Sequence, residues 1–110
     1  MSNNTDILEE LATCIRQRRQ TNAPQSYTAK LLTGSEDSLL KKLAEEACEA
    51  ALAAKAGDTA RLTEEMADLW FHCLVVMERY NLSWHEVAAA LSSRRGTSGI
   101  TEKAARKEKQ

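Results

Sequence analysis

Between residues 38 and 80 the apolar positions recur every three or four residues, the period of an α-helix that buries one face. The pattern is interrupted once, where Gly57 suits the left-handed residue that ends a helix and Asp58 or Thr59 suits the N-cap of the next helix. The expected apolar stripe before Gly57 is Leu40, Leu43, Ala47, Ala50, Ala51 and Ala54. The expected stripe after it is Leu62, Met66, Leu69, Cys73, Val76 and Met77. Because short loops join antiparallel neighbours, we predict an antiparallel helical hairpin.

Shorter helices are expected on both sides of this hairpin. The apolar spacing near the N-terminus predicts a helix over Asp6–Gln20, and Ser26 can cap a short helix that ends at about Thr33. Ser83 and Glu86 have the spacing of a capping box, which predicts a helix over Trp84–Ser92. The fold class is therefore all-α, built from one hairpin and flanking short helices.

Each helix of the predicted hairpin carries two acidic residues three positions apart. Glu46 and Glu49 lie eleven and eight residues before Gly57, and Glu65 and Asp68 lie eight and eleven residues after it. At about 1.5 Å per residue, the hairpin would bring all four carboxylates to one level, roughly 12 to 16 Å from the turn. The helical period also places each pair along the border of its apolar stripe. We therefore expect the four side chains to converge on one groove.

Four converging carboxylates repel one another unless a positive charge lies between them. An all-oxygen ligand set suits a hard cation such as Mg²⁺, with Mn²⁺ as a substitute, rather than zinc. With Lys42 and Arg61 beside the acids, such a site could hold a polyphosphate, and a carboxylate could orient or deprotonate a water molecule. The alternative is that these acids are solvated helix faces, because glutamate is a common helix former. By the same period, Glu45 and Glu64 lie further round their helices and are expected at the surface.

Composition narrows the class of protein. The chain has 110 residues, 43% of them hydrophobic, and a formal net charge of −1, which indicates a single domain over 1–110 and no bulk affinity for nucleic acid. The three cysteines form no Cys-x-x-Cys pair, so we expect reduced thiols rather than a disulfide framework or a zinc site. The N-terminus lacks the features of a secretory signal, and no apolar run has membrane-spanning length. We expect a cytoplasmic protein.

Three further features of the sequence each admit more than one interpretation. Residues 93–110 hold six basic residues and no clear apolar stripe, so from pattern alone they indicate a solvated, flexible tail. Tyr27 is an aromatic residue in a polar segment, where a packing anchor is expected and a ligand contact is the alternative. His72 lies beside the acids, but a single helical histidine at the edge of a core is expected to be structural.

Longer runs of sequence resemble the phosphoribosyl-ATP pyrophosphohydrolase family of histidine biosynthesis, within the all-α nucleoside triphosphate pyrophosphohydrolases. The acid-bearing runs 41–49 and 65–72 resemble the wider superfamily, and the narrower resemblance rests on 26–31 before Gly34 and on 95–106. The sequence departs from the pattern expected in many members at Ala44, where glycine is usual, and at Phe71, where tyrosine is usual.

The resemblance implies Mg²⁺-dependent cleavage of the α–β phosphoanhydride of phosphoribosyl-ATP, giving phosphoribosyl-AMP and pyrophosphate. It implies that Glu46, Glu49, Glu65 and Asp68 are metal ligands and that Glu45 is a supporting acid or water activator, with catalysis resting on Glu45, Glu46 and Glu49. It also implies phosphate contacts from a set of basic residues, namely Lys30, Lys42, Arg95, Lys103 and Arg106. The tail would then order over the substrate. A homodimer or higher homo-oligomer with a four-helix-bundle-like core is implied as well.

Two other functions remain open at this point. A house-cleaning nucleoside triphosphate pyrophosphatase of the MazG-like type would share the acids without needing the 26–31 and C-terminal segments. A non-enzymatic helical dimerisation module would keep the apolar stripes and would bind no Mg²⁺.

Overall fold

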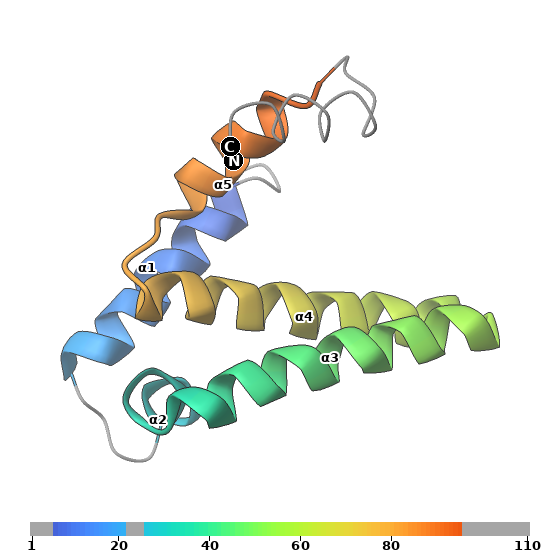
Figure 1. Cartoon of the computed structure of the whole chain (residues 1–110), viewed down its shortest axis with the longest axis horizontal. Helices are drawn as coiled ribbons and strands as arrows, with labels where there is room; N and C mark the ends of the chain where they lie inside the picture. Colours follow the sequence, from blue (N-terminus) through green and yellow to red (C-terminus); the bar gives the residue numbers. More distant parts are fainter. Residues whose placement is uncertain (1–5, 22–25, 96–110) are drawn as a thin grey trace, which may run out of the picture.

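The computed structural model describes residues 6–21 and 26–95, which form α-helices connected by short turns (Figure 1). The helices of this part of the chain are α1 (Asp6–Thr21), α2 (Tyr27–Thr33), α3 (Glu36–Ala56), α4 (Thr59–Arg79) and α5 (Trp84–Ser92). The all-α class and the predicted hairpin, formed by α3 and α4, are confirmed, and no strand occurs within the described ranges. The 93–110 tail lies outside them from residue 96 onward.

The turn between α3 and α4 has the capping chemistry that the sequence predicted. Gly57 has a φ of 75°, and its N–H donates to carbonyl oxygens of the last turn of α3. Asp58, rather than Thr59, is the N-cap of α4, because its Oδ1 accepts a hydrogen bond of 3.0 Å from the N–H of Arg61. Since these caps are local, the position of the turn follows from the sequence around it.

The core lies where α1 and α2 pack against the N-terminal part of α3 and the C-terminal half of α4. Its buried apolar side chains are Ile15, Leu32, Leu39, Leu74 and Val75. Partly buried apolar residues, among them Phe71 and Trp84, pack around this cluster. The other end of the hairpin extends beyond the core, as Figure 1 shows, so that α3 and α4 are each other's main support there.

The buried face of α3 is rotated from the one that we expected, whereas the predicted stripe of α4 is mostly half-buried. In α3 the buried residues are Leu39, Glu46, Ala50 and Ala53, whereas Leu40, Ala47, Ala51 and Ala54 of the predicted stripe are exposed. The spacing of the buried set, seven, four and three residues, is that of a narrow seam between two helices. In α4 the buried residues are His72, Leu74 and Val75, because this helix is covered by α3 on one side and by α1 and α2 on another.

Polar contacts fasten α2 to α4. The guanidinium of Arg79 donates to the carbonyl oxygens of Leu31 and Gly34, at 2.8 Å each. A Cβ on Gly34 would lie 2.7 Å from the carbonyl oxygen of Lys30, so the end of α2 needs a glycine to turn this closely. These contacts hold the C-terminal end of α2 against α4.

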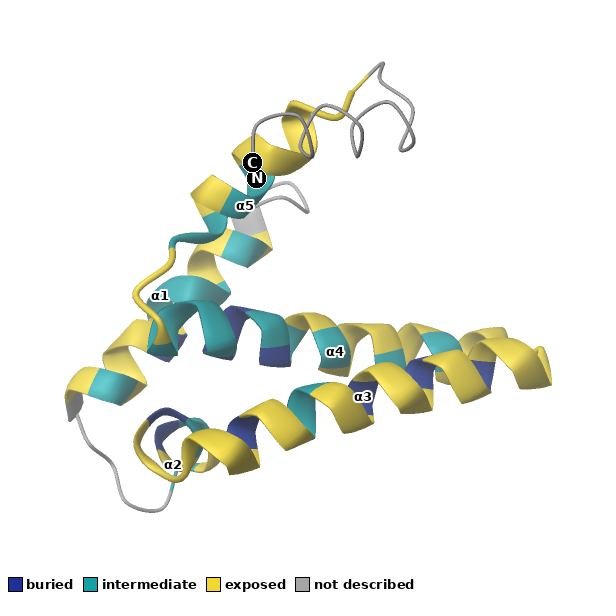
Figure 2. Cartoon of the chain, viewed as in Figure 1, coloured by how far each residue is buried: buried dark blue, intermediate teal, exposed yellow. Residues whose placement is uncertain are grey.

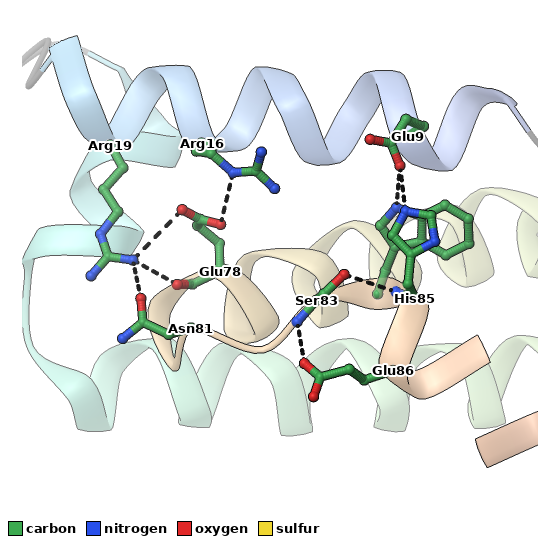
Figure 3. A network of polar contacts seen from close by, with 9 residues as sticks. Glu9, Arg16, Arg19, Glu78, Asn81, Ser83, His85 and Glu86 are labelled. Atoms are coloured by element: carbon green, nitrogen blue, oxygen red, sulfur yellow. Dashed lines mark hydrogen bonds and ion pairs between the residues drawn. The ribbon is translucent and has the colours of Figure 1, made fainter. Parts of the chain in front are cut away.

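A second polar network, drawn in Figure 3, joins α1 to the end of α4 and to α5. Arg19 Nη1 donates to the Glu78 carbonyl oxygen at 2.7 Å and to Asn81 Oδ1 at 3.2 Å. Further along α1, Glu9 Oε2 accepts a hydrogen bond of 2.8 Å from Trp84 Nε1 and lies 2.9 Å from His85 Nε2 (Figure 3). The predicted capping box of Ser83 and Glu86 is confirmed.

Much of the surface away from the core is exposed (Figure 2), and it includes large apolar side chains. Leu52 and Trp70 are each 57% exposed and Leu91 is 62% exposed. An open groove of about 370 Å³ runs between α4 and α5, and its lining includes Trp70, Met77, Val87 and Leu91. Within the described residues, no helix combines the length and the apolar character that a membrane crossing requires.

Candidate active site

Three of the predicted acids meet at the middle of the hairpin. Glu46 and Glu49 come from α3 and Glu65 from α4, and each offers a carboxylate oxygen within 4.8 Å of the other two. Glu46 is only 5% exposed, Glu65 is half-buried and Glu49 is exposed. The cluster therefore extends from inside the helix seam to solvent.

The charges around the cluster are only partly balanced. Lys42 Nζ lies 3.3 Å from Glu46 Oε1, and Arg61 Nε lies 3.9 Å from Glu65 Oε1. The second oxygens of Glu46 and Glu65, both Oε2, are buried and have no hydrogen-bond partner. Burying a carboxylate oxygen without a hydrogen-bond partner costs free energy. The contacts with Lys42 and Arg61 therefore leave the site short of positive charge.

The pKa values reflect this shortage. Burial raises the pKa of the Glu65 carboxyl, a hydrogen bond and charge repulsion from Glu49 raise it further, and Asp68 adds to the repulsion. Arg61 acts in the opposite direction without cancelling them. The pKa of Lys42 is raised, first by its hydrogen bond with Glu46 and next by the proximity of Tyr27.

The donor set fits a divalent cation. The converging groups are all carboxylate oxygens, which suits Mg²⁺ or Mn²⁺, and the two unpaired buried oxygens belong to the same residues that would coordinate the ion. The exposed Glu49 leaves one side open to a ligand. Among the described residues, Glu46, Glu49 and Glu65 form the converging group that could hold a metal.

Asp68, the fourth predicted acid, lies at the margin of the cluster. It is exposed and does not belong to the group within 4.8 Å, although its charge contributes to the raised pKa of Glu65. Its backbone carbonyl oxygen is engaged by the Nδ1 of His72 at 2.7 Å.

The other predicted site residues are dispersed. Glu45 is exposed and lies 4.0 Å from Lys41 in an ion pair along the surface of α3. Lys30 is exposed on α2, and Arg95 donates to Ser92 Oγ at the end of α5, which Figure 1 shows running away from α3. Lys103 and Arg106 lie outside the described residues. Of the predicted phosphate-binding residues, the structure brings Lys42 to the acids.

A pair of residues that sequence reasoning did not join lies next to the acids. The Nε2 of buried His72 is 2.9 Å from the hydroxyl oxygen of Tyr27, across 45 positions of sequence. His72 is four residues after Asp68 and seven after Glu65, so its place on the acid-bearing edge of α4 was a signal in the sequence. Its partner could be known only from the packing of α2.

Comparisons with known proteins identify the family of this chain. The family model described as phosphoribosyl-ATP pyrophosphohydrolase matches residues 8–95. A protein of Nitrosospira multiformis called phosphoribosyl-ATP pyrophosphatase is 51% identical over 102 residues, covering 93% of this chain and 84% of the relative. Proteins of the same name from Nitrosomonas eutropha and Bordetella parapertussis are 42% and 49% identical, over 100% and 92% of this chain and 94% and 90% of the relatives. The chain therefore belongs to the phosphoribosyl-ATP pyrophosphohydrolase family of hydrolases.

Proposed function

We propose that this enzyme hydrolyses phosphoribosyl-ATP at its α–β phosphoanhydride, giving phosphoribosyl-AMP and pyrophosphate, as the second step of histidine biosynthesis. The observation that carries the proposal is the convergence of Glu46, Glu49 and Glu65 within 4.8 Å, with two buried oxygens unpaired. The names of the relatives supply the substrate. The three free thiols described in the structure suit a reducing compartment, and we place the enzyme in the cytoplasm.

The site residues would have two roles, which are metal binding and phosphate binding. Glu46, Glu49 and Glu65 would hold Mg²⁺, or Mn²⁺ in its place, with Asp68 available as a fourth ligand at the margin. The bound ion would neutralise charge on the phosphate oxygens of the substrate. Lys42, which lies against Glu46, would neutralise further phosphate charge from the α3 side. Lys30, Arg95, Lys103 and Arg106 remain candidates for more distant phosphate contacts.

One acid must orient or deprotonate the attacking water. Glu49 is the best placed, because it lies in the cluster and is also exposed. Glu45 remains a candidate for a supporting role, although its ion pair with Lys41 directs it along the outer surface of α3. Glu46 is buried and paired with Lys42, which suits an oxygen ligand better than a base.

We also propose that two copies of the chain associate through their exposed apolar faces. The hairpin presents two helices whose outer sides are uncovered in a single chain, and the apolar groove beside Trp70 continues this face onto α5. Pairing two hairpins would bury these faces and complete a four-helix bundle.

The experiment is pyrophosphate release from phosphoribosyl-ATP and from ATP in separate and competing reactions, with Mg²⁺ and with EDTA. We expect Mg²⁺-dependent release that strongly favours phosphoribosyl-ATP, and its loss in Glu49→Gln. Equal or faster release from ordinary nucleoside triphosphates would assign the protein to the house-cleaning class. Absence of release from every substrate would favour a non-enzymatic dimerisation module.

A further inference from the structure

His72 is an unusual residue to bury beside carboxylates. It is 4% exposed, and both ring nitrogens are engaged: Nδ1 with the carbonyl oxygen of Asp68 at 2.7 Å and Nε2 with the hydroxyl of Tyr27 at 2.9 Å. The ring also contacts Phe71 edge-on, with centroids 5.3 Å apart. These contacts fix both the position and the orientation of the imidazole.

The partners of His72 determine where the protons lie. A carbonyl oxygen only accepts, so Nδ1 must carry a proton and donate to Asp68. In the neutral imidazole Nε2 is then the acceptor, and the Tyr27 hydroxyl must donate to it. The hydroxyl proton is thereby used inside the protein, while the lone pairs of the Tyr27 oxygen remain able to accept.

Tyr27 is anchored to the protein by its hydroxyl and is also partly exposed to solvent. Its side chain is bonded to α4 through His72, yet the residue is 50% exposed. It is also a neighbour of Lys42, whose pKa its proximity helps to raise, and Lys42 is paired with Glu46 of the acid cluster. Lys42 thus links Tyr27 to the acid cluster.

We propose that Tyr27 is a specificity residue whose oxygen accepts a hydrogen bond from a sugar hydroxyl of the substrate, and that His72 is the positioning residue that sets Tyr27 for this role. With its proton committed to His72, the Tyr27 oxygen has none to donate to a phosphate oxygen, so it selects a donor. Lys42 offers the cationic donor that phosphate requires. Tyr27 would therefore bind a sugar hydroxyl, and the neighbouring Lys42 would bind a phosphate. The inference rests on the proposed function, because phosphoribosyl-ATP supplies the sugar hydroxyls.

The test is steady-state kinetics of the wild type and Tyr27→Phe, which keeps the ring and removes the oxygen. We expect KM for phosphoribosyl-ATP to rise about 3- to 10-fold, the range for losing one neutral hydrogen bond, with kcat changed less than about 2-fold. Substrate analogues that lack one sugar hydroxyl at a time identify the partner. One analogue should raise the KM of the wild type by a similar factor and leave the KM of Tyr27→Phe unchanged.

Arg79→Gln is the matched control, because it removes the other side-chain attachment of α2 to α4 without touching the acids. It should lower the melting temperature and leave KM unchanged. If Tyr27→Phe has the wild-type KM, or if every analogue affects both proteins equally, the inference is wrong while the proposed function stands. If the wild type does not hydrolyse phosphoribosyl-ATP, the proposed function fails and the inference with it.

Discussion

Glu46 occupies a position where packing alone would place an apolar residue. It lies in the seam of α3 with Leu39, Ala50 and Ala53, and it is as buried as they are. An apolar side chain of similar volume at such a position is often neutral or stabilising, whereas an incompletely paired carboxylate is costly. Stability therefore does not explain Glu46, whereas the proposed binding of a cation would. The same reasoning applies to the buried Oε2 of Glu65.

The raised pKa of Glu65 predicts how the metal-free protein responds to pH. A carboxyl whose pKa is higher in the folded state than in the unfolded state favours folding at low pH, and this contribution is lost as pH rises through the folded pKa. In EDTA, Glu65→Gln should be more stable than the wild type at pH 8, and the difference should shrink as the pH falls toward 5. Thermal unfolding of both proteins across this range measures the effect.

Adding Mg²⁺ gives a second test of the same idea, because a bound cation should supply the positive charge that the acid cluster lacks. Added Mg²⁺ should raise the melting temperature of the wild type more than that of Glu65→Gln. A difference in melting temperature between the two proteins that is constant from pH 5 to pH 8 would contradict the raised pKa of Glu65.

At the scale of elements, the ends of the helices could be predicted from the sequence, but the buried face of α3 could not. Ser26, Gly57, Asp58 and Ser83 cap the helices as expected, because a cap depends on bonds within a few residues. The buried face of α3 depends instead on how α4 lies against it. The alanine and leucine residues of α3 cover a wider part of its surface than one contact with α4 can bury. The sequence therefore does not determine which of them face α4.

The candidate site likewise contains features that the sequence predicted and features that depend on packing. The acids could be grouped from their symmetric spacing about Gly57, and three of them lie together. The contact between Tyr27 and His72 could not be anticipated, since it needs α2 to fold back over α4. Arg95 was grouped with the phosphate-binding residues by resemblance, and in a single chain it lies at the end of α5, away from the acids.

The turn offers a prediction at this scale. Gly57 has a φ of 75°, and a Cβ there would meet no atom within 4 Å, so Gly57→Ala isolates the cost of the left-handed backbone. We expect a loss of about 1 kcal/mol in the free energy of unfolding. Gly57→Asn should lose less, because asparagine tolerates this conformation. Urea denaturation measures both, and an alanine variant as stable as the wild type would contradict the strain argument.

At the scale of the whole molecule, the apolar surface exceeds what one chain can cover. The core is concentrated at the crossing of α1, α2 and α4, and the outer sides of the hairpin are uncovered. Exposed large side chains on α3, α4 and α5 form the faces that a second copy would bury.

Trp70 tests this association most directly, because it is 57% exposed and lines the apolar groove. Trp70→Glu should raise the dimer dissociation constant at least 100-fold in sedimentation equilibrium, since a charge would be desolvated at the interface. Lys41→Ser, a change on the charged surface of α3, should leave it unchanged. An undiminished dimer in the Trp70 variant would show that copies associate elsewhere.

The most direct test of the acid cluster is the dependence of pyrophosphate release on Mg²⁺ concentration, compared between the wild type, Glu65→Gln and the matched control Glu64→Gln. Glu64 is exposed and adjacent in sequence, but it is not among the converging acids. We expect Glu65→Gln to need at least tenfold more Mg²⁺ for half-maximal turnover, or to be inactive, while Glu64→Gln follows the wild type. Identical Mg²⁺ dependence in all three proteins would contradict the assignment of the metal to this cluster.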